Sequence, residues 1–144
     1  IELIANADED IINIPELIYI KAQALSELKK YDEAIENFKM LIDLDFDDFN
    51  IWIDYADVVE DYKGSEEAEK ILEQGIKAYP DCSSLQYRIA ACKYKSDKIL
   101  QALLCLYKAM NTDFTDLDLF FEYMPELKES KDILSLIDII NKIK

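Results

Sequence analysis

The sequence predicts an all-α fold, an α-solenoid of stacked antiparallel helix pairs with a C-terminal capping helix. Two series of small residues repeat every 34 residues, the first being Ala22, Ala56 and Ala90 and the second Ala34, Ala68 and Ala102. Apolar residues around these alanines follow the i, i+3, i+4, i+7 spacing of one helix face. The chain has only 2 Gly and 3 Pro, fewer turn residues than a β-rich fold needs.

The first residues are expected to precede the repeating part. Residues 1–14 begin with Ile1, Leu3 and Ile4 and continue with an acidic stretch. We interpret them as the end of a preceding helix plus a loop, in a chain whose true start lies earlier. Pro15 suits the first turn of a new helix, because the N–H group that proline lacks has no helical partner there.

Three units follow, each predicted to hold two helices, and they span residues 15–48, 49–82 and 83–116. Apolar faces at helical spacing mark the two helices of each unit. These faces are Ile18, Ala22, Leu25 and then Ala34, Ile35, Phe38, Leu41; Trp52, Tyr55, Ala56, Val59 and then Ala68, Ile71, Leu72, Gly75; and Leu85, Ile89, Ala90 and then Ile99, Ala102, Leu103, Leu106, Ala109. Gly64 suits the left-handed position that ends a helix.

The pattern degrades over residues 117–144, which we interpret as a degenerate repeat with capping helices. Pro125 should end the first of these helices. The last helix, within residues 130–144, is expected to turn Ile133, Leu136, Ile137, Ile140 and Ile143 inward. Terminal units of an array are commonly atypical, because their outer face meets water.

Residues 15–116 resemble three tetratricopeptide repeats. The segment Lys30–Phe38, with the sequence KYDEAIENF, is similar to the start of the second helix of such a repeat. Trp52, Tyr55 and Ala56 match the first-helix signature, and Pro80 stands at the closing proline. Phe46 and Phe114 replace that proline in the other two units, and Gly75 stands where alanine is usual.

Composition excludes several classes of function. The net charge of −15, with 31 acidic against 16 basic residues, opposes binding to nucleic acid or to an anionic membrane, and no run is apolar enough to span a bilayer. The chain lacks histidine, the commonest general base and zinc ligand. It also lacks a phosphate-binding glycine loop, and the acidic stretch Asp43–Asp48 lacks the glycine of a calcium loop. We therefore expect no enzyme activity, no cofactor and no metal.

The cysteines give an expectation of location. Cys82, Cys92 and Cys105 form neither a metal-ligand spacing nor an even disulfide set. Such a set fits a reducing compartment, where each cysteine acts as a small apolar residue. We expect a cytoplasmic protein.

The resemblance implies a protein–protein interaction module that binds an extended or helical segment on the concave wall lined by the first helix of each unit. The residues expected to bind the ligand are Tyr19, Gln23, Ile53, Asp57, Glu60, Tyr87, Arg88 and Tyr94. Tyrosines would supply contact area, and Asp57 and Glu60, with Asp54 and Asp61 nearby, would favour a basic partner segment. The alternative is a structural spacer or self-association segment of a longer repeat protein.

Overall fold

The computed structural model describes residues 14–143, so the helix end and loop expected over residues 1–14 lie outside the described residues, apart from Ile14 in the loop. The described part holds eight α-helices and two short 3₁₀ helices and no strand. In chain order they are α2 (Pro15–Glu27), α3 (Tyr31–Asp43), α4 (Asn50–Lys63), α5 (Ser65–Ala78), α6 (Ser83–Lys95), α7 (Ile99–Thr112), η1 (Phe114–Asp116), α8 (Leu117–Tyr123), η2 (Pro125–Leu127) and α9 (Lys131–Ile143). None of these helices is long and apolar enough to cross a membrane.

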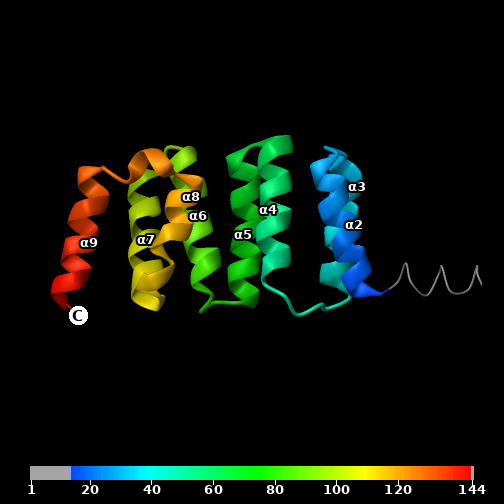
Figure 1. The fold of residues 1–144 in the computed structure, drawn as a ribbon, viewed down its shortest axis with the longest axis horizontal. Helices are drawn as coiled ribbons and strands as arrows, with labels where there is room; N and C mark the ends of the chain where they lie inside the picture. Colours follow the sequence, from blue (N-terminus) through cyan, green and yellow to red (C-terminus); the bar gives the residue numbers. More distant parts are fainter. Residues whose placement is uncertain (1–13, 144) are drawn as a thin grey trace, which may run out of the picture.

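The helices pack as successive pairs in one elongated row (Figure 1). α2 packs on α3, α4 on α5 and α6 on α7, and the pairs are joined through contacts of α3 with α4 and of α5 with α6. This is the predicted α-solenoid. The six alanines of the two series are all 0% exposed, as expected of small residues at the contacts between neighbouring helices.

Turns between the paired helices repeat as well. Lys29 and Asp97 both have positive φ, 59° and 63°. After each of them the chain closes in the same way, with Lys30 N–H bonded to Leu25 C=O and Lys98 N–H to Lys93 C=O, both at 2.9 Å. Gly64, at φ 101°, takes the corresponding turn between α4 and α5, where a residue without Cβ bears no strain.

Gly75 marks a close approach between α4 and α5. A Cβ atom added there would lie 2.9 Å from both Cβ and Cγ of Trp52, which is inside van der Waals contact. The glycine that replaces the usual alanine therefore makes room for the indole ring.

Two apolar cores meet at the third pair. The first core runs from α2 to α6, and in it Phe38 stacks on Tyr55 with ring centroids 5.7 Å apart, which links the first pair to the second. The second core joins α6 and α7 to α8 and α9. Cys105, on α7, packs against both cores.

Regular stacking ends after α7. α4 packs on α3 and α6 packs on α5, so each of these first helices contacts the second helix of the preceding pair. α8 instead packs mainly on α6, the first helix of the preceding pair. α8 ends at Tyr123 before Pro125, as expected. On α9, Ile133 and Ile140 are buried, but Ile143 is 69% exposed. The expectation that Ile143 faces inward is wrong, because the last turn of α9 extends past the core at the end of the row.

Candidate functional site

The expected binding residues lie on three successive first helices but not on one open wall. Tyr19 and Gln23 are on α2, Ile53, Asp57 and Glu60 on α4, and Tyr87, Arg88 and Tyr94 on α6. Of these, Gln23 and Asp57 line a groove. Ile53 packs against the first core, Tyr87 and Arg88 are buried, and Tyr94 is half-buried.

The groove lies between α2 and α4 and encloses about 440 Å³. Phe38 and Tyr31 of α3 and Val58 of α4 supply its apolar lining. Gln23 and Ser26 add polar groups, and the remaining lining residues are carboxylates, namely Glu27, Asp54, Asp57 and Asp61. No lysine or arginine lines it. We call this feature the acidic groove.

Hydrogen bonds hold the rim of the acidic groove in place. Tyr19 Oη and Gln23 Nε2 both donate a hydrogen bond to Asp54 Oδ2, and the hydrogen bond from Gln23 is 3.3 Å long. Burial, and then the bond to Asp54, raise the pKa of the Tyr19 hydroxyl, which stays a donor at neutral pH. Tyr19 also packs edge-on against Phe38. Its role in the structure is to orient Asp54.

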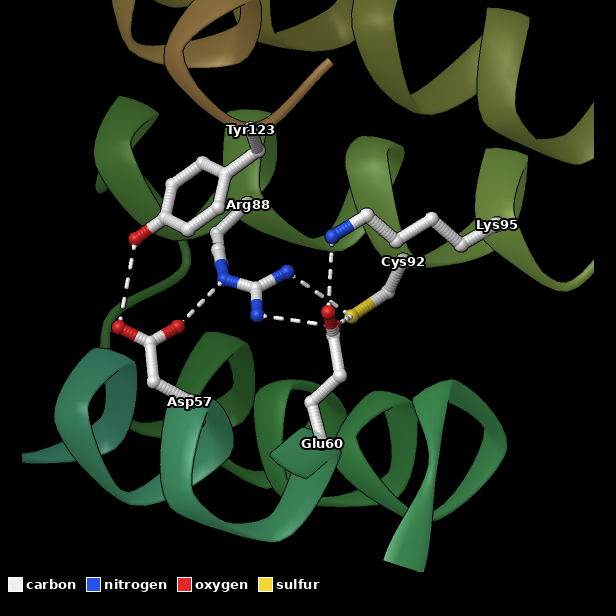
Figure 2. Close-up of polar contacts among 6 residues, drawn as sticks. All are labelled: Asp57, Glu60, Arg88, Cys92, Lys95 and Tyr123. Atoms are coloured by element: carbon white, nitrogen blue, oxygen red, sulfur yellow. Dashed lines mark hydrogen bonds and ion pairs between the residues drawn. The ribbon is translucent and has the colours of Figure 1, made fainter. Parts of the chain in front are cut away.

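Arg88, the only arginine of the chain, is the centre of an ionic cluster beside the acidic groove (Figure 2). Its Nε donates to Asp57 and its Nη2 to Glu60, both at 2.9 Å, and its side chain is 2% exposed. Its Nη1 donates to Cys92 Sγ at 3.1 Å. Lys95 Nζ also reaches Glu60, at 2.8 Å. The basic group that we expected Asp57 and Glu60 to take from a ligand is thus supplied by the chain itself.

α8 covers the inner face of α6. Tyr123 places its ring over the Arg88 guanidinium, 4.1 Å from its Cζ, and Phe120 packs against Tyr94 with ring centroids 5.9 Å apart. Tyr87 is fully buried and donates its hydroxyl to Asp113 C=O at 2.7 Å. The expectation that Tyr87 and Arg88 line an open wall is therefore wrong, because the chain after Asp113 packs over them, whereas Tyr94 is half-buried and partly exposed.

The geometry of the cluster determines the protonation states of Glu60 and Cys92. Burial raises the pKa of Glu60, but the bonds from Lys95 and Arg88 outweigh it and hold the pKa at about 2. Burial raises the pKa of the Cys92 thiol to about 12, so that at neutral pH it is a protonated donor to Glu60, 3.3 Å away. A thiol in that state is no nucleophile. Among the described residues no three Cys, Asp or Glu side chains are grouped as metal ligands.

The sequence did not lead us to predict which charged side chains pair within the chain and which line the acidic groove. Arg88 lies 34 residues after Asp54, so it occupies in α6 the position that Asp54 has in α4. The exchange of a carboxylate for the only arginine, at one repeat position, was the signal that an internal ion pair joins the two units. Glu27, Tyr31 and Phe38, which line the acidic groove, were not expected there, because they come from the end of α2 and from α3.

Comparisons with known proteins agree with the fold. A family model described as tetratricopeptide repeat matches residues 25–92. Residues 25–92 are thus similar to tetratricopeptide repeats, and proteins built from such repeats are in general modules for protein–protein interaction and are typically not enzymes.

Two solved structures resemble it over most of its length. "MamA 41-end from Desulfovibrio magneticus RS-1" is 19% identical at a TM-score of 0.64, covering 91% of this chain and 74% of that one. "MamA RS-1 ArsTM double mutant" is 18% identical at a TM-score of 0.62, covering 90% of this chain and 75% of that one. At such identity the likeness shows the fold alone. No curated protein matches the sequence.

Proposed function

We propose that this chain binds a basic segment of a partner protein in the acidic groove between α2 and α4. The observation that carries the proposal is the lining of the groove, which has four carboxylates and no cationic side chain beside an apolar floor of Phe38 and Val58. A lysine or arginine side chain would lay its apolar stem on that floor and place its charged end among the carboxylates.

The Arg88 cluster supports this choice of ligand. It is an internal example of a guanidinium held by carboxylates of α4, with Nε bonded to Asp57 and Nη2 to Glu60, and such charge-assisted hydrogen bonds are stronger than neutral ones. Asp57 accepts from Arg88 at Oδ1 and from Tyr123 at Oδ2, 3.5 Å away, yet its side chain is still 42% exposed where it lines the groove. The bound segment would be short, because α8 closes the inner face at α6.

The variant for testing the acidic groove must spare the fold. Asp57 and Glu60 hold the buried Arg88, and Asp54 holds Tyr19 and Gln23. Glu27 and Asp61 line the groove, are exposed and form no bond or ion pair within the described residues. Glu27→Gln/Asp61→Asn therefore removes two groove charges and leaves the cluster intact.

The experiment is a fluorescence anisotropy titration of a labelled peptide, acetyl-Gly-Arg-Gly-Lys-Gly-Arg-amide, at two salt concentrations. We expect binding that weakens with salt and is reduced about three- to tenfold in Glu27→Gln/Asp61→Asn, since exposed charge pairs contribute about 0.2–1 kcal/mol each. The control, Glu36→Gln/Glu126→Gln, removes two exposed carboxylates outside the groove. No binding, or equal weakening in both variants, would rule out the acidic groove as the site.

A structural or self-association role is the second candidate, favoured by α9. Leu134, Ile139 and Ile143 are exposed on this last helix of the row, where a further repeat or a second copy could stack. Light scattering over a range of protein concentrations tests this role. A mass that rises with concentration, and stays constant in Ile139→Lys/Ile143→Lys, would support it; a constant mass of the unmodified chain would exclude self-association through α9.

A further inference from the structure

A second hollow lies between α5, α6 and α7 and shares no lining residue with the acidic groove. It encloses about 370 Å³, and its apolar lining includes Ile76, Ile89 and Cys105, one from each helix. Each of the three side chains is at least partly removed from water by the neighbouring core.

The charge of this hollow is opposite to that of the chain. Lys77, Lys93 and Lys108 line it against a single carboxylate, Glu73, in a protein with almost twice as many acidic as basic residues. Lys93 is already bonded, to Glu69 at 2.8 Å and to Gln101 at 3.1 Å. Lys77 and Lys108 are exposed, and their ammonium groups have no hydrogen-bond or ion-pair partner within residues 14–143. Two ammonium groups are thus available at one apolar surface, which we call the basic hollow.

Exposed leucines extend the apolar surface along α7. Leu100 and Leu104 are 79% and 70% exposed, more than any other large apolar side chain of the described residues. Leu104 directly precedes Cys105 and lies one helical turn before Lys108. Exposed apolar area next to charges of one sign is typical of a protein-binding surface.

We infer that the basic hollow binds an acidic, apolar segment of a partner protein. A leucine-sized side chain of the segment enters between Ile76 and Ile89, a second one covers Leu104, and neighbouring carboxylates pair with Lys77 and Lys108. Charge complementarity selects this ligand, because the acidic remainder of the surface repels a carboxylate everywhere except where lysines gather. The inference does not depend on the acidic groove, whose ligand has the opposite charge.

The test is a titration of the isotope-labelled chain with the peptide acetyl-Gly-Leu-Glu-Leu-Asp-Gly-amide, followed by amide chemical shifts. We expect saturable shifts at Ile76, Ile89 and Cys105 that leave Gln23 and Asp61 of the acidic groove unchanged. Lys77→Glu/Lys108→Glu should weaken binding at least fivefold. Both lysines are exposed, and thermal unfolding verifies that this variant keeps its fold.

Two controls separate the site from general attraction. Lys39→Glu/Lys131→Glu makes the same change of net charge at two exposed lysines outside the hollow and should bind the peptide as the unmodified chain does. A peptide with serine in place of both leucines should not bind. Absence of shifts with the leucine peptide, equal weakening in the two variants, or undiminished binding of the serine peptide would each overturn the inference.

A second copy of the chain is the competing occupant, since the chain itself is acidic. Sedimentation velocity at rising protein concentration decides this point. We expect the sedimentation coefficient of the unmodified chain and of Lys77→Glu/Lys108→Glu to agree at every concentration. Association that the lysine reversal abolishes would assign the basic hollow to self-association and overturn the inference of a separate partner.

Discussion

Replacing Gly75 with alanine tests how closely α4 approaches α5. In a helix interior this change ordinarily stabilises a protein by about 1 kcal/mol, because glycine has more backbone freedom to lose on folding. Here the new Cβ would lie 2.9 Å from Cβ and Cγ of Trp52 and 3.2 Å from its Cδ2. Of these atoms Cβ is fixed by the backbone of α4, so the contact with it is relieved only if the two helices move apart.

The expected result is a change of sign. Overpacking of a tight contact costs about 1–3 kcal/mol, so we expect Gly75→Ala to lower the free energy of unfolding by about 1–2 kcal/mol. The corresponding fall in the melting temperature is about 3–6 °C for a chain of this size. Urea denaturation and thermal unfolding, followed by circular dichroism, measure both quantities.

A double-mutant cycle with Trp52→Ala isolates the contact. Removing the indole leaves only Cβ of residue 52 near the new methyl group, and α4 regains room to adjust. Gly75→Ala should therefore cost at least about 1 kcal/mol less in the Trp52→Ala background than in the unmodified chain. If Gly75→Ala stabilises the unmodified chain, or costs the same in both backgrounds, the close approach that we infer between α4 and α5 is refuted.

Three further predictions concern the buried charges. Lys93→Met should lower the free energy of unfolding by about 3 kcal/mol, because Glu69, 2.8 Å away and almost fully buried, loses a partner. The double variant Glu69→Leu/Lys93→Met should cost less than about 1 kcal/mol. Equal losses for the two variants in urea denaturation would contradict this prediction. Glu60, whose pKa of about 2 lies below the ordinary 4.5, stabilises the fold above about pH 4.5 and loses that contribution as the pH falls towards 2. Glu60→Gln should therefore remove about 2–3 kcal/mol of the acid dependence of stability, and urea midpoints that fall as steeply below pH 4.5 as before would disagree. Arg88→Met should lower the free energy of unfolding by about 3–5 kcal/mol, since it leaves Asp57 and Glu60 without their shared cation. In thermal unfolding, Arg88→Lys should retain only part of this stability, because an ammonium group lacks the planar, multiple-donor geometry of the guanidinium group.

The helix pairs could be predicted because the signals for them are local. Periodic apolar faces mark each helix, and a small residue every 34 positions marks each close crossing. The six alanines are accordingly all buried, and Pro125 ends α8 where expected. The exposed position of Ile143 could not be read from its helix alone, because its spacing on α9 is that of the inward face. It depends on where the row of helices ends.

The candidate site could be predicted only in part. The acidic character near Asp54, Asp57 and Asp61 follows from the first-helix face of the second unit. Phe38, which forms part of the floor of the acidic groove, comes from α3, and α8 packed on α6 covers the neighbouring helix face. Neither contribution lies on the helix face from which the site was predicted.

Taken alone, the sequence determined the all-α repeat, the pairing of helices and the strongly acidic surface, because helix periodicity and charge depend on neighbours within one repeat. The tertiary structure decided which charges remain open to a partner. Arg88 meets Asp57 and Glu60 across two units, and Tyr123 closes over it from a third. Such contacts depend on how the units stack and on the departure of α8 from that stacking, which no spacing within a single helix encodes.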